Sequence, residues 1–391
     1  MILSDVCEFI VDCPHSTAPD EGEGYPLIRT PNVGKGRLDL NGVHRVSESV
    51  YKQRIQRGAP RANDLIFARE APAGNVALVQ ENQTVCLGQR TVLIRPNVQK
   101  VNPQYLVYYL LSPKPQYELL GTANGATVAH VNLPAIRNLK IELPEKSVQD
   151  KIGTILVTYD DLIENNQKQI KLLEEAAQRL YKEWFVDFRF PGHENTKIVD
   201  GVPEGWSKST VGNICKLRKV VITPDKIESN TPYIGLEHMP RNDICLSTWG
   251  KSEEINSNKF IYLKKDVLFG KIRPYFHKVG FALNDGITST DTMVMVADQN
   301  LWGLLLVTVS SDAFVDFSYQ NCKEGAKMPR ADWKQMEKYA IMIADQATQK
   351  LFEQEILVIT NKISALAFQC RSLREARDRM LPKLMGGEVE V

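Results

Sequence analysis

The chain has 391 residues, of which 43% are hydrophobic, 24% charged and 8% aromatic. This composition excludes disordered, collagen-like and disulfide-scaffold proteins, and the length allows two or three domains that each bury a core. Lysine plus arginine number 48 against 47 acidic residues, so the net charge of +1 gives no global attraction to nucleic acid or membrane, and such binding would have to come from local patches. We expect a cytoplasmic protein, because the seven cysteines are scattered, the first residues do not resemble a signal peptide and no apolar run is long enough to cross a membrane.

Residues 1–145 alternate short apolar runs with Gly, Pro and Asn, which predicts a domain of mixed strands and helices. Strands are expected at 65–68 and 91–94, and a short helix near 105–111. The next segment, 146–190, has almost no Gly or Pro and keeps a helical period throughout, so it is expected to form one long helix.

A linker at 191–204 leads to a second mixed domain at 205–345, with strands expected at 267–270 and 292–296. A second long helix is predicted at 346–391.

The second half of the chain repeats the first with an offset of about 200 residues. Residues 63–72 return as 265–274, and residues 173–180 return as 373–380. Because these matches keep the same order at nearly one offset, the sequence predicts an internal duplication with pseudo-twofold symmetry.

Both predicted long helices carry apolar residues spaced alternately four and three apart, which is the stripe of a coiled coil. The alternative is two amphipathic helices that each pack on their own domain; the stripe favours pairing because it exceeds three to four heptads. The predicted interface consists of Ile152, Leu156, Tyr159, Ile163, Ile170, Leu173 and Leu180 in the first helix and Phe352, Ile356, Ile359, Ile363, Leu366, Leu373 and Met380 in the second.

The order of domain, helix, domain, helix requires paired helices to run antiparallel. The predicted fold class is therefore α/β (α+β), with two similar globular domains separated by two long antiparallel helices. In the second helix, Pro382 is expected to interrupt the helix near its end, and Gly386 and Gly387 are expected to terminate it.

Two similar heads at a fixed separation suit a target with two separated half-sites, and double-stranded DNA is such a target. Neither domain is basic as a whole, but Lys and Arg are bunched within each, and these side chains contact phosphates and guanines. The competing interpretation of any single one is an ordinary solvated charge. The candidate DNA-binding residues are Arg54, Arg57, Arg61, Arg69, Gln89 and Arg90 in the first domain and Lys264, Lys265, Lys271, Arg273, Lys278, Lys327 and Arg330 in the second.

The helical segments carry a resemblance to a known family. Residues 141–152 and 160–167, the Trp-Phe-Val-Asp-Phe run at 184–188 and the Val-Pro-Glu-Gly-Trp run at 202–206 resemble the DNA-specificity subunits of type I restriction–modification enzymes. Residues 263–275 resemble the target-recognition domains of that family. The resemblance implies a non-catalytic subunit that reads an asymmetric bipartite target and holds two modification (methyltransferase) subunits through its helices, with restriction subunits completing the complex.

Sequence signals for catalysis are weak. The run Asn230-Thr-Pro-Tyr233 lacks one proline of an adenine-methyltransferase motif, no phosphate-binding loop is present, and Cys13-Pro-His15 has no second ligand pair for zinc. We therefore expect no catalytic residue, metal or cofactor. The alternatives are a self-sufficient methyltransferase or nuclease with a degenerate site, and a coiled-coil adaptor that does not bind DNA.

Overall fold

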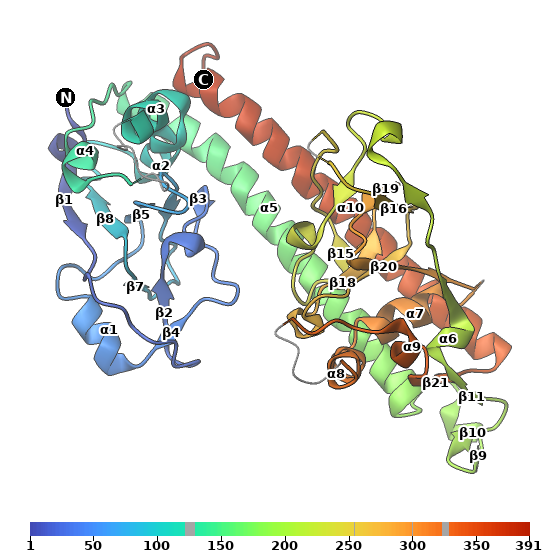
Figure 1. Cartoon of the computed structure of the whole chain (residues 1–391). Coiled ribbons are helices and arrows are strands. Elements are labelled where there is room, and N and C mark those ends of the chain that lie inside the picture. Colours follow the sequence, from blue (N-terminus) through green and yellow to red (C-terminus); the bar gives the residue numbers. More distant parts are fainter. Residues whose placement is uncertain (122–129, 254, 299, 323–327) are drawn as a thin grey trace. The chain divides into compact units, whose positions relative to one another are not determined.

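The computed structural model divides into two compact units, each described here by itself. The first unit contains residues 1–164 and 372–391, and the second contains residues 165–371. Each unit therefore holds one globular domain and a part of both long helices (Figure 1). The structure describes residues 1–121, 130–253, 255–298, 300–322 and 328–391.

A five-stranded sheet forms the centre of the first globular domain. Its strands, in spatial order, are β1 (Cys7–Asp12), β8 (Thr91–Pro96), β5 (Leu65–Ala68), β6 (Val76–Leu78) and β3 (Gly36–Arg37). A smaller sheet has the order β4 (Arg45–Val46), β2 (Tyr25–Ile28) and β7 (Cys86–Leu87). The helices are α1 (Glu48–Arg54), α2 (Pro103–Leu111), α3 (Pro113–Gly121) and α4 (Leu133–Arg137). The core between sheet and helices buries Phe67, Tyr105 and Tyr108 completely or almost so, because apolar area removed from water stabilises the fold.

The second globular domain repeats this topology. Its five-stranded sheet has the order β12 (Cys215–Leu217), β20 (Thr292–Ala297), β17 (Val267–Gly270), β18 (Val279–Ala282) and β15 (Cys245–Leu246). A four-stranded sheet has the order β13 (Val221–Ile222), β16 (Lys259–Tyr262), β19 (Gly286–Thr288) and β14 (Tyr233–Ile234). The helices α6 (Val211–Ile214), α7 (Trp302–Val309), α8 (Asp312–Gln320) and α9 (Trp333–Met336) and the paired strands β11 (Ser207–Thr210) and β21 (Ala340–Ile343) complete it.

The matching strand orders confirm the internal duplication. In both large sheets the first four strands are antiparallel, and the outermost strand, β3 or β15, runs parallel to its neighbour. In both small sheets one parallel pair recurs, β2 with β7 and β14 with β19. All four strands expected from the sequence are present. The hairpin of β9 (Ile198–Val199) and β10 (Val202–Pro203) lies in the segment expected as a linker.

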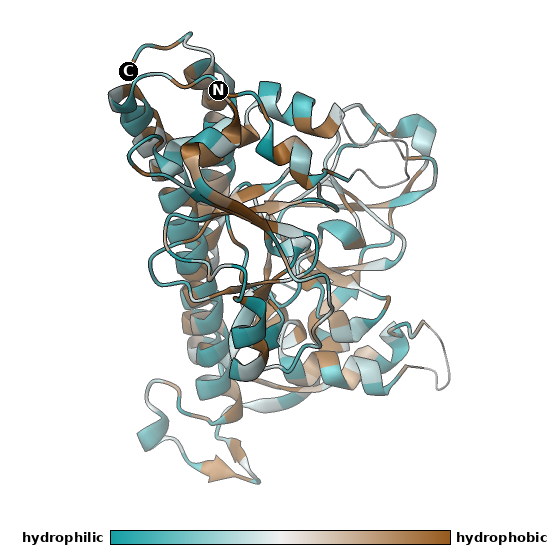
Figure 2. Ribbon diagram, turned by 90° about the vertical axis from the view of Figure 1, so that its left-hand side faces the viewer, coloured by the Kyte–Doolittle hydropathy of each residue, from teal (hydrophilic) through white to brown (hydrophobic). Residues whose placement is uncertain are grey.

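The two long helices are α5 (Lys146–Tyr181), which continues into a π-helical turn at Lys182–Val186, and α10 (Gln346–Met385). Every residue of both predicted stripes is buried or half-buried. The long helical ribbons accordingly alternate between hydrophobic and hydrophilic residues (Figure 2).

In each unit the two helices run antiparallel. In the first unit, Leu384 packs in the same apolar cluster as Ile152 and Leu156 near the start of α5. In the second unit, Phe352 near the start of α10 lies 5.6 Å, between ring centroids, from Trp184 just after α5. The prediction that the two helices pack against each other is therefore confirmed. The alternative, in which each amphipathic helix packs only on its own domain, is wrong.

The expectation that Pro382 interrupts the second helix is wrong. The helix continues to Met385, because proline removes only one backbone hydrogen bond in the last turn while Leu384, 2% exposed, still packs against the core. The expected stop at Gly386 and Gly387 is confirmed, and Gly387 has a φ of +72°. None of the helices in the described part of the chain is both long and apolar enough to cross a membrane.

Close packing of α7 on α10 gives a stability prediction for Gly303. A Cβ atom on Gly303 would lie 2.9 Å from Cβ of Ile356, which is completely buried on α10. We expect Gly303→Ala to lower the free energy of unfolding by about 1–3 kcal/mol, because neither backbone can retreat. Gly121→Ala is the matched control, since among the described residues no atom beyond its chain neighbours and its own helix backbone lies within 4 Å of the added Cβ. Equal denaturant midpoints for the two variants would contradict this packing argument.

Candidate nucleic-acid interface

Charged side chains gather at one end of the large sheet in each unit. In the first unit, Asp12 ends β1, Arg69 follows β5 and Arg90 precedes β8. These three strands are neighbours in the order β1-β8-β5, and Asp12 pairs with Val92 while Ala68 pairs with Thr91. The three charged residues therefore lie at the same edge, which we call the strand-end cluster of the first unit.

Arg69 is the centre of this cluster. Its Nη1 donates to Asp12 Oδ2 at 2.6 Å, its Nε donates to the Val131 carbonyl at 2.9 Å, and its Nη2 lies 2.8 Å from His130 Nε2. Because a guanidinium only donates, His130 Nε2 accepts this hydrogen bond. The other ring nitrogen, Nδ1, then donates to Glu70 Oε1, and these two atoms are 2.6 Å apart. Arg69 is 9% exposed and fully engaged, so it supports the cluster from within, and we leave it out of the proposed DNA contacts.

The accessible part of the cluster consists of the exposed residues Arg90, Arg57 and His15 and the half-buried Gln89. Arg90 Nη1 is 2.5 Å from Glu70 Oε2, and its side chain is 61% exposed. Arg57 donates to the Cys13 carbonyl at 3.1 Å, and Gln89 donates to the His15 carbonyl at 3.0 Å. Three residues predicted from the sequence to contact DNA, Arg57, Gln89 and Arg90, are thus brought together at an accessible edge.

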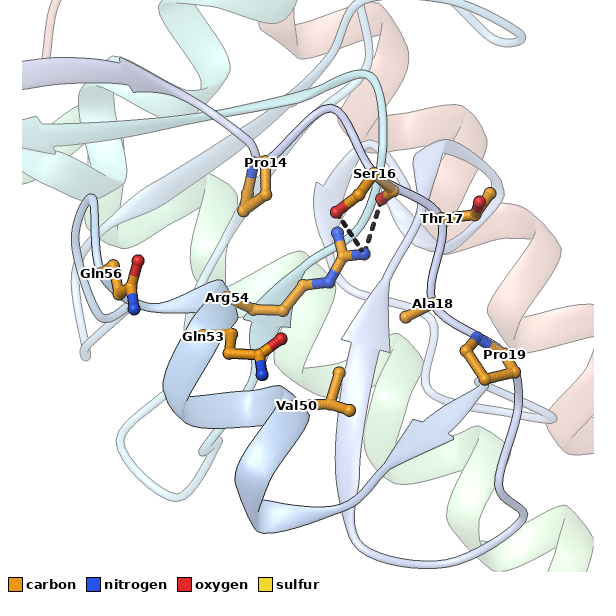
Figure 3. A pocket seen from close by; sticks show the side chains of 9 residues that line it. All are labelled: Pro14, Ser16, Thr17, Ala18, Pro19, Val50, Gln53, Arg54 and Gln56. Atoms are coloured by element: carbon orange, nitrogen blue, oxygen red, sulfur yellow. Dashed lines mark hydrogen bonds between the residues drawn. The ribbon is translucent and has the colours of Figure 1, made fainter.

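Arg54 and Arg61 are not among the accessible members of this cluster. Arg54 is 4% exposed, and its guanidinium donates to the carbonyls of Ser16 at 2.5 Å and Leu87 at 3.3 Å. It borders a hollow of about 450 Å³ between α1 and the loop around Ser16, and in Figure 3 its guanidinium turns toward that loop. Arg61 stands before β5, at the opposite end of that strand from Arg69, and pairs with Glu8 at 3.2 Å. Arg54 is therefore a structural residue, and its burial prevents it from contacting DNA directly.

The second unit has a strand-end cluster in the corresponding place. Lys271 follows β17, Asp291 precedes β20, and Arg330 pairs with Asp291 at 3.0 Å. The backbone bonds recur as well: Lys271 N donates to the Asp291 carbonyl at 2.8 Å, as Arg69 N does to the Arg90 carbonyl at 2.9 Å. The duplicated fold therefore presents two different sets of charges at one equivalent edge.

Lys271 is surrounded by other cations. Its Nζ donates to the Thr290 carbonyl at 2.7 Å. Burial lowers the pKa of Lys271; Asp291 raises it, and Arg330 and Lys219 lower it. Among the described residues, Lys271, Arg330 and Lys219 thus lie around Asp291, whereas the first unit sets Arg57, Arg69 and Arg90 against Asp12 and Glu70, with His15 and His130 beside them.

The remaining candidates of the second unit divide between the two ends of β17. Arg273 and Lys278 lie on the loop after β17, beside Lys271, and Lys278 Nζ donates to the Leu236 carbonyl at 2.5 Å. Lys264 and Lys265 are exposed in the turn before β17, so they do not join the cluster. Lys327 lies outside the described residues.

Several residues of these clusters were missed from the sequence. His15 was considered only as a possible zinc ligand, while His130 in the first unit and Lys219 in the second stand alone in the sequence, and only the fold brings these residues to the others. The repeat offers a signal for one of them, because Arg330 and His130 are 200 positions apart. Tyr233, from the weak methyltransferase signal, begins β14 and rests against His238. No group of three or more His, Cys, Asp or Glu that could hold a metal occurs among the described residues.

Comparison with known proteins identifies the relatives of this chain. Residues 1–175 match the family described as "Type I restriction modification DNA specificity domain". The type I restriction enzyme MjaIX specificity subunit of Methanocaldococcus jannaschii is 26% identical over 381 residues, covering 90% of this chain and 83% of that protein. The chain is a relative of type I restriction enzyme specificity subunits. The EcoBI specificity subunit of Escherichia coli is 26% identical over 195 residues, covering 46% of this chain and 40% of that protein.

The fold agrees with this relationship. A crystal structure of a type I restriction–modification system S subunit from M. genitalium matches with a TM-score of 0.56 and 15% identity, covering 98% of this chain and 95% of that one. The likeness confirms the predicted class, an α+β chain with two similar globular domains and two long helices. The resemblance recognised from the sequence agrees with these relatives, which are themselves named specificity subunits of type I restriction enzymes.

Proposed function

We propose that this chain is the DNA-reading, non-catalytic specificity subunit of a type I restriction–modification complex. Each globular domain reads one half of an asymmetric, bipartite target in double-stranded DNA. Arg57, Gln89 and Arg90 contact DNA in the first domain, and Lys271, Arg273 and Arg330 do so in the second. These contacts are local, in keeping with a net charge of +1.

One observation carries this proposal: the two domains share one topology but differ in charge at the equivalent edge. The first cluster sets three arginines against two carboxylates, with two histidines beside them, whereas the second sets two lysines and an arginine around Asp291. Because base edges are read by the side chains placed against them, two readers with different side chains favour two different half-site sequences. A palindromic target would require the same side chains in both strand-end clusters.

The helices supply the other part of the function. They contain 36 and 40 residues, so each is roughly 54–60 Å long at about 1.5 Å per residue. That length falls between one and two turns of DNA at about 34 Å per turn. We propose that they fix the spacer between the half-sites and dock two modification (methyltransferase) subunits, with restriction subunits added in the full complex in the cytoplasm.

Exchange of one domain tests the proposal. Residues 1–145 are replaced by the corresponding residues of a relative, and the full-length hybrid is expressed with its modification subunit. We expect methylome sequencing to show one changed half-site, with the other half-site and the spacer unchanged. Exchange of residues 205–345 is the reciprocal experiment and should change only the other half-site. A target unaltered by either exchange would refute the assignment.

A further inference from the structure

Three aromatic rings form an exposed cluster beside the strand-end cluster of the second unit. The ring of Tyr275 lies 4.9 Å from that of Phe276 and 5.2 Å from that of Tyr319, between centroids, and both contacts are edge-to-face. Tyr275 and Tyr319 are each 46% exposed. Neighbours on two sides hold Tyr275 in place while nearly half of it meets solvent.

Two guanidinium groups accompany these rings. The guanidinium carbon of Arg241 lies 4.0 Å from the centroid of Phe276, and that of Arg273 lies 5.8 Å from it. Neither arginine forms an ion pair with a carboxylate among the residues that the structure describes. Exposed rings together with two guanidinium groups suit a polyanion that also offers flat aromatic faces, which is the chemistry of a nucleic acid.

The loop that carries Tyr275 is held in an unusual conformation. Arg273 and His277, which flank Pro274–Phe276, have φ values of +50° and +51°. Residues other than glycine rarely have φ values in this left-handed region, and backbone strain of this kind is found at functional sites. Two contacts hold the loop: His277 Nε2 lies 2.9 Å from the Ser310 carbonyl, and Arg273 N donates to the Pro329 carbonyl at 2.8 Å. The loop therefore presents its ring from a fixed backbone.

The first unit has no aromatic residue at the position that corresponds to Tyr275. In the repeat, Pro72 corresponds to Pro274, so Ala73 stands where Tyr275 stands in the second domain. The same loop thus carries a small side chain in one domain and a large ring in the other. A role in the shared fold would not require this difference, whereas a role in reading one half-site would.

We propose that Tyr275 stacks against a base at an opened base step of the half-site read by the second domain. Arg241 and Arg273 neutralise the adjacent phosphates, and Phe276 and Tyr319 keep the Tyr275 ring in place. Opening a step costs unstacking energy that depends on its sequence, so this contact adds specificity without hydrogen bonds to base edges. The inference rests on the proposed DNA-reading function.

A mismatch scan tests the contact. Full-length wild-type chain and the Tyr275→Ala variant are titrated with the bipartite duplex and with duplexes that carry one mismatch at successive steps of the second half-site. On the intact duplex we expect Tyr275→Ala to bind about ten-fold or more weakly, since stacking on an aromatic side chain contributes strongly to affinity. At one step the mismatch should strengthen wild-type binding and leave Tyr275→Ala unaffected, because a step that is already open costs nothing to open.

The controls separate this inference from the proposed function. Tyr117→Ala removes a tyrosine that is 82% exposed in the first unit and should bind every duplex as the wild type does, while Tyr275→Phe should keep the step-specific effect. If Tyr275→Ala loses the same affinity on every duplex, or none, the stacking contact is refuted even though the wild type still reads its target. If Tyr275→Ala instead loses only assembly with the modification subunits, the cluster is a protein-docking surface, which also overturns the inference. A wild-type chain that ignores the target would refute the proposed function itself.

Discussion

Replacement of Arg377 by methionine should destabilise the first unit by about 3–5 kcal/mol, the cost typical of removing one partner from a buried ion pair. Arg377 on α10 contacts the carboxylate of Asp160 on α5, and Asp160 is 3% exposed. The other Asp160 oxygen accepts a hydrogen bond from the Tyr108 hydroxyl at 2.6 Å. Without Arg377, the Asp160 carboxylate keeps its burial but loses the cation that compensates it. Denaturant unfolding of the full chain measures the change.

Two further variants isolate the ion pair. Arg379→Met removes an exposed arginine from the same helix and should change stability by no more than about 0.5 kcal/mol. The double variant Asp160→Asn with Arg377→Met removes both charges and should recover most of the loss, because the amide oxygen can still accept from the Tyr108 hydroxyl and no buried charge is left without its partner. Equal stability of Arg377→Met and Arg379→Met would show that the pair contributes nothing.

The second unit should lose stability as the pH rises from about 5 to 8, and Glu174→Gln should remove most of that slope. The pKa of Glu174 is raised from 4.5 to about 8, chiefly by burial and also by the charge of Asp243, while the backbone N–H groups of Ile244 and Cys245 and the charge of Lys171 act to lower it. The folded protein therefore retains a proton that the unfolded chain releases above about 4.5. Since the folded state binds more protons in this range, the stabilisation is complete below the unfolded pKa and is lost as the pH approaches 8.

The effect can be large. A rise from 4.5 to about 8 corresponds to at most about 5 kcal/mol at roughly 1.4 kcal/mol per pH unit. In the Glu174→Gln variant, the amide oxygen can still accept from the N–H groups of Ile244 and Cys245, which lie 2.9 and 3.2 Å from the carboxylate. The exposed neighbour Glu175, changed to Gln, is the control and should keep the wild-type slope. A slope that persists in Glu174→Gln, measured by unfolding at pH 5, 6.5 and 8, would assign the pH dependence to another group.

The sequence predicted the features that depend on periodicity. The stripe from Ile152 to Leu180 has a helical period, and burial follows directly from such a period. The repeat predicted two similar domains, and Asp64 and Asp266 do occupy the same turn: each accepts from the backbone N–H three residues before it. Each also binds an arginine, Asp64 the Arg95 of β8 and Asp266 the Arg218 that follows β12. Pro382 was misjudged, since local propensity says nothing of the tertiary packing that holds the last turn of α10.

The candidate interface was only partly predictable, because its partners are distant in the sequence. Arg69 meets Asp12 across 57 positions and His130 across 61, and no local pattern marks either contact. Arg54 and Arg90 are equally basic in the sequence, yet one is buried against carbonyl groups and the other is exposed. A cluster of charges thus indicates which surface to examine, whereas the fold decides which of its members can reach a ligand.

The ion pair between Asp160 and Arg377 also bears on how the two halves of the chain depend on each other. At the repeat-related positions stand Thr360, which is 2% exposed, and Ala177, which is completely buried. Two copies of the N-terminal half would place Ala177 against Asp160 and leave a buried carboxylate without a cation between the helices. Two copies of the C-terminal half would place Arg377 against Thr360 and leave the guanidinium without a carboxylate. The duplicated halves have therefore diverged into complementary pieces, so that an N-terminal half pairs better with a C-terminal half than with a second copy of itself.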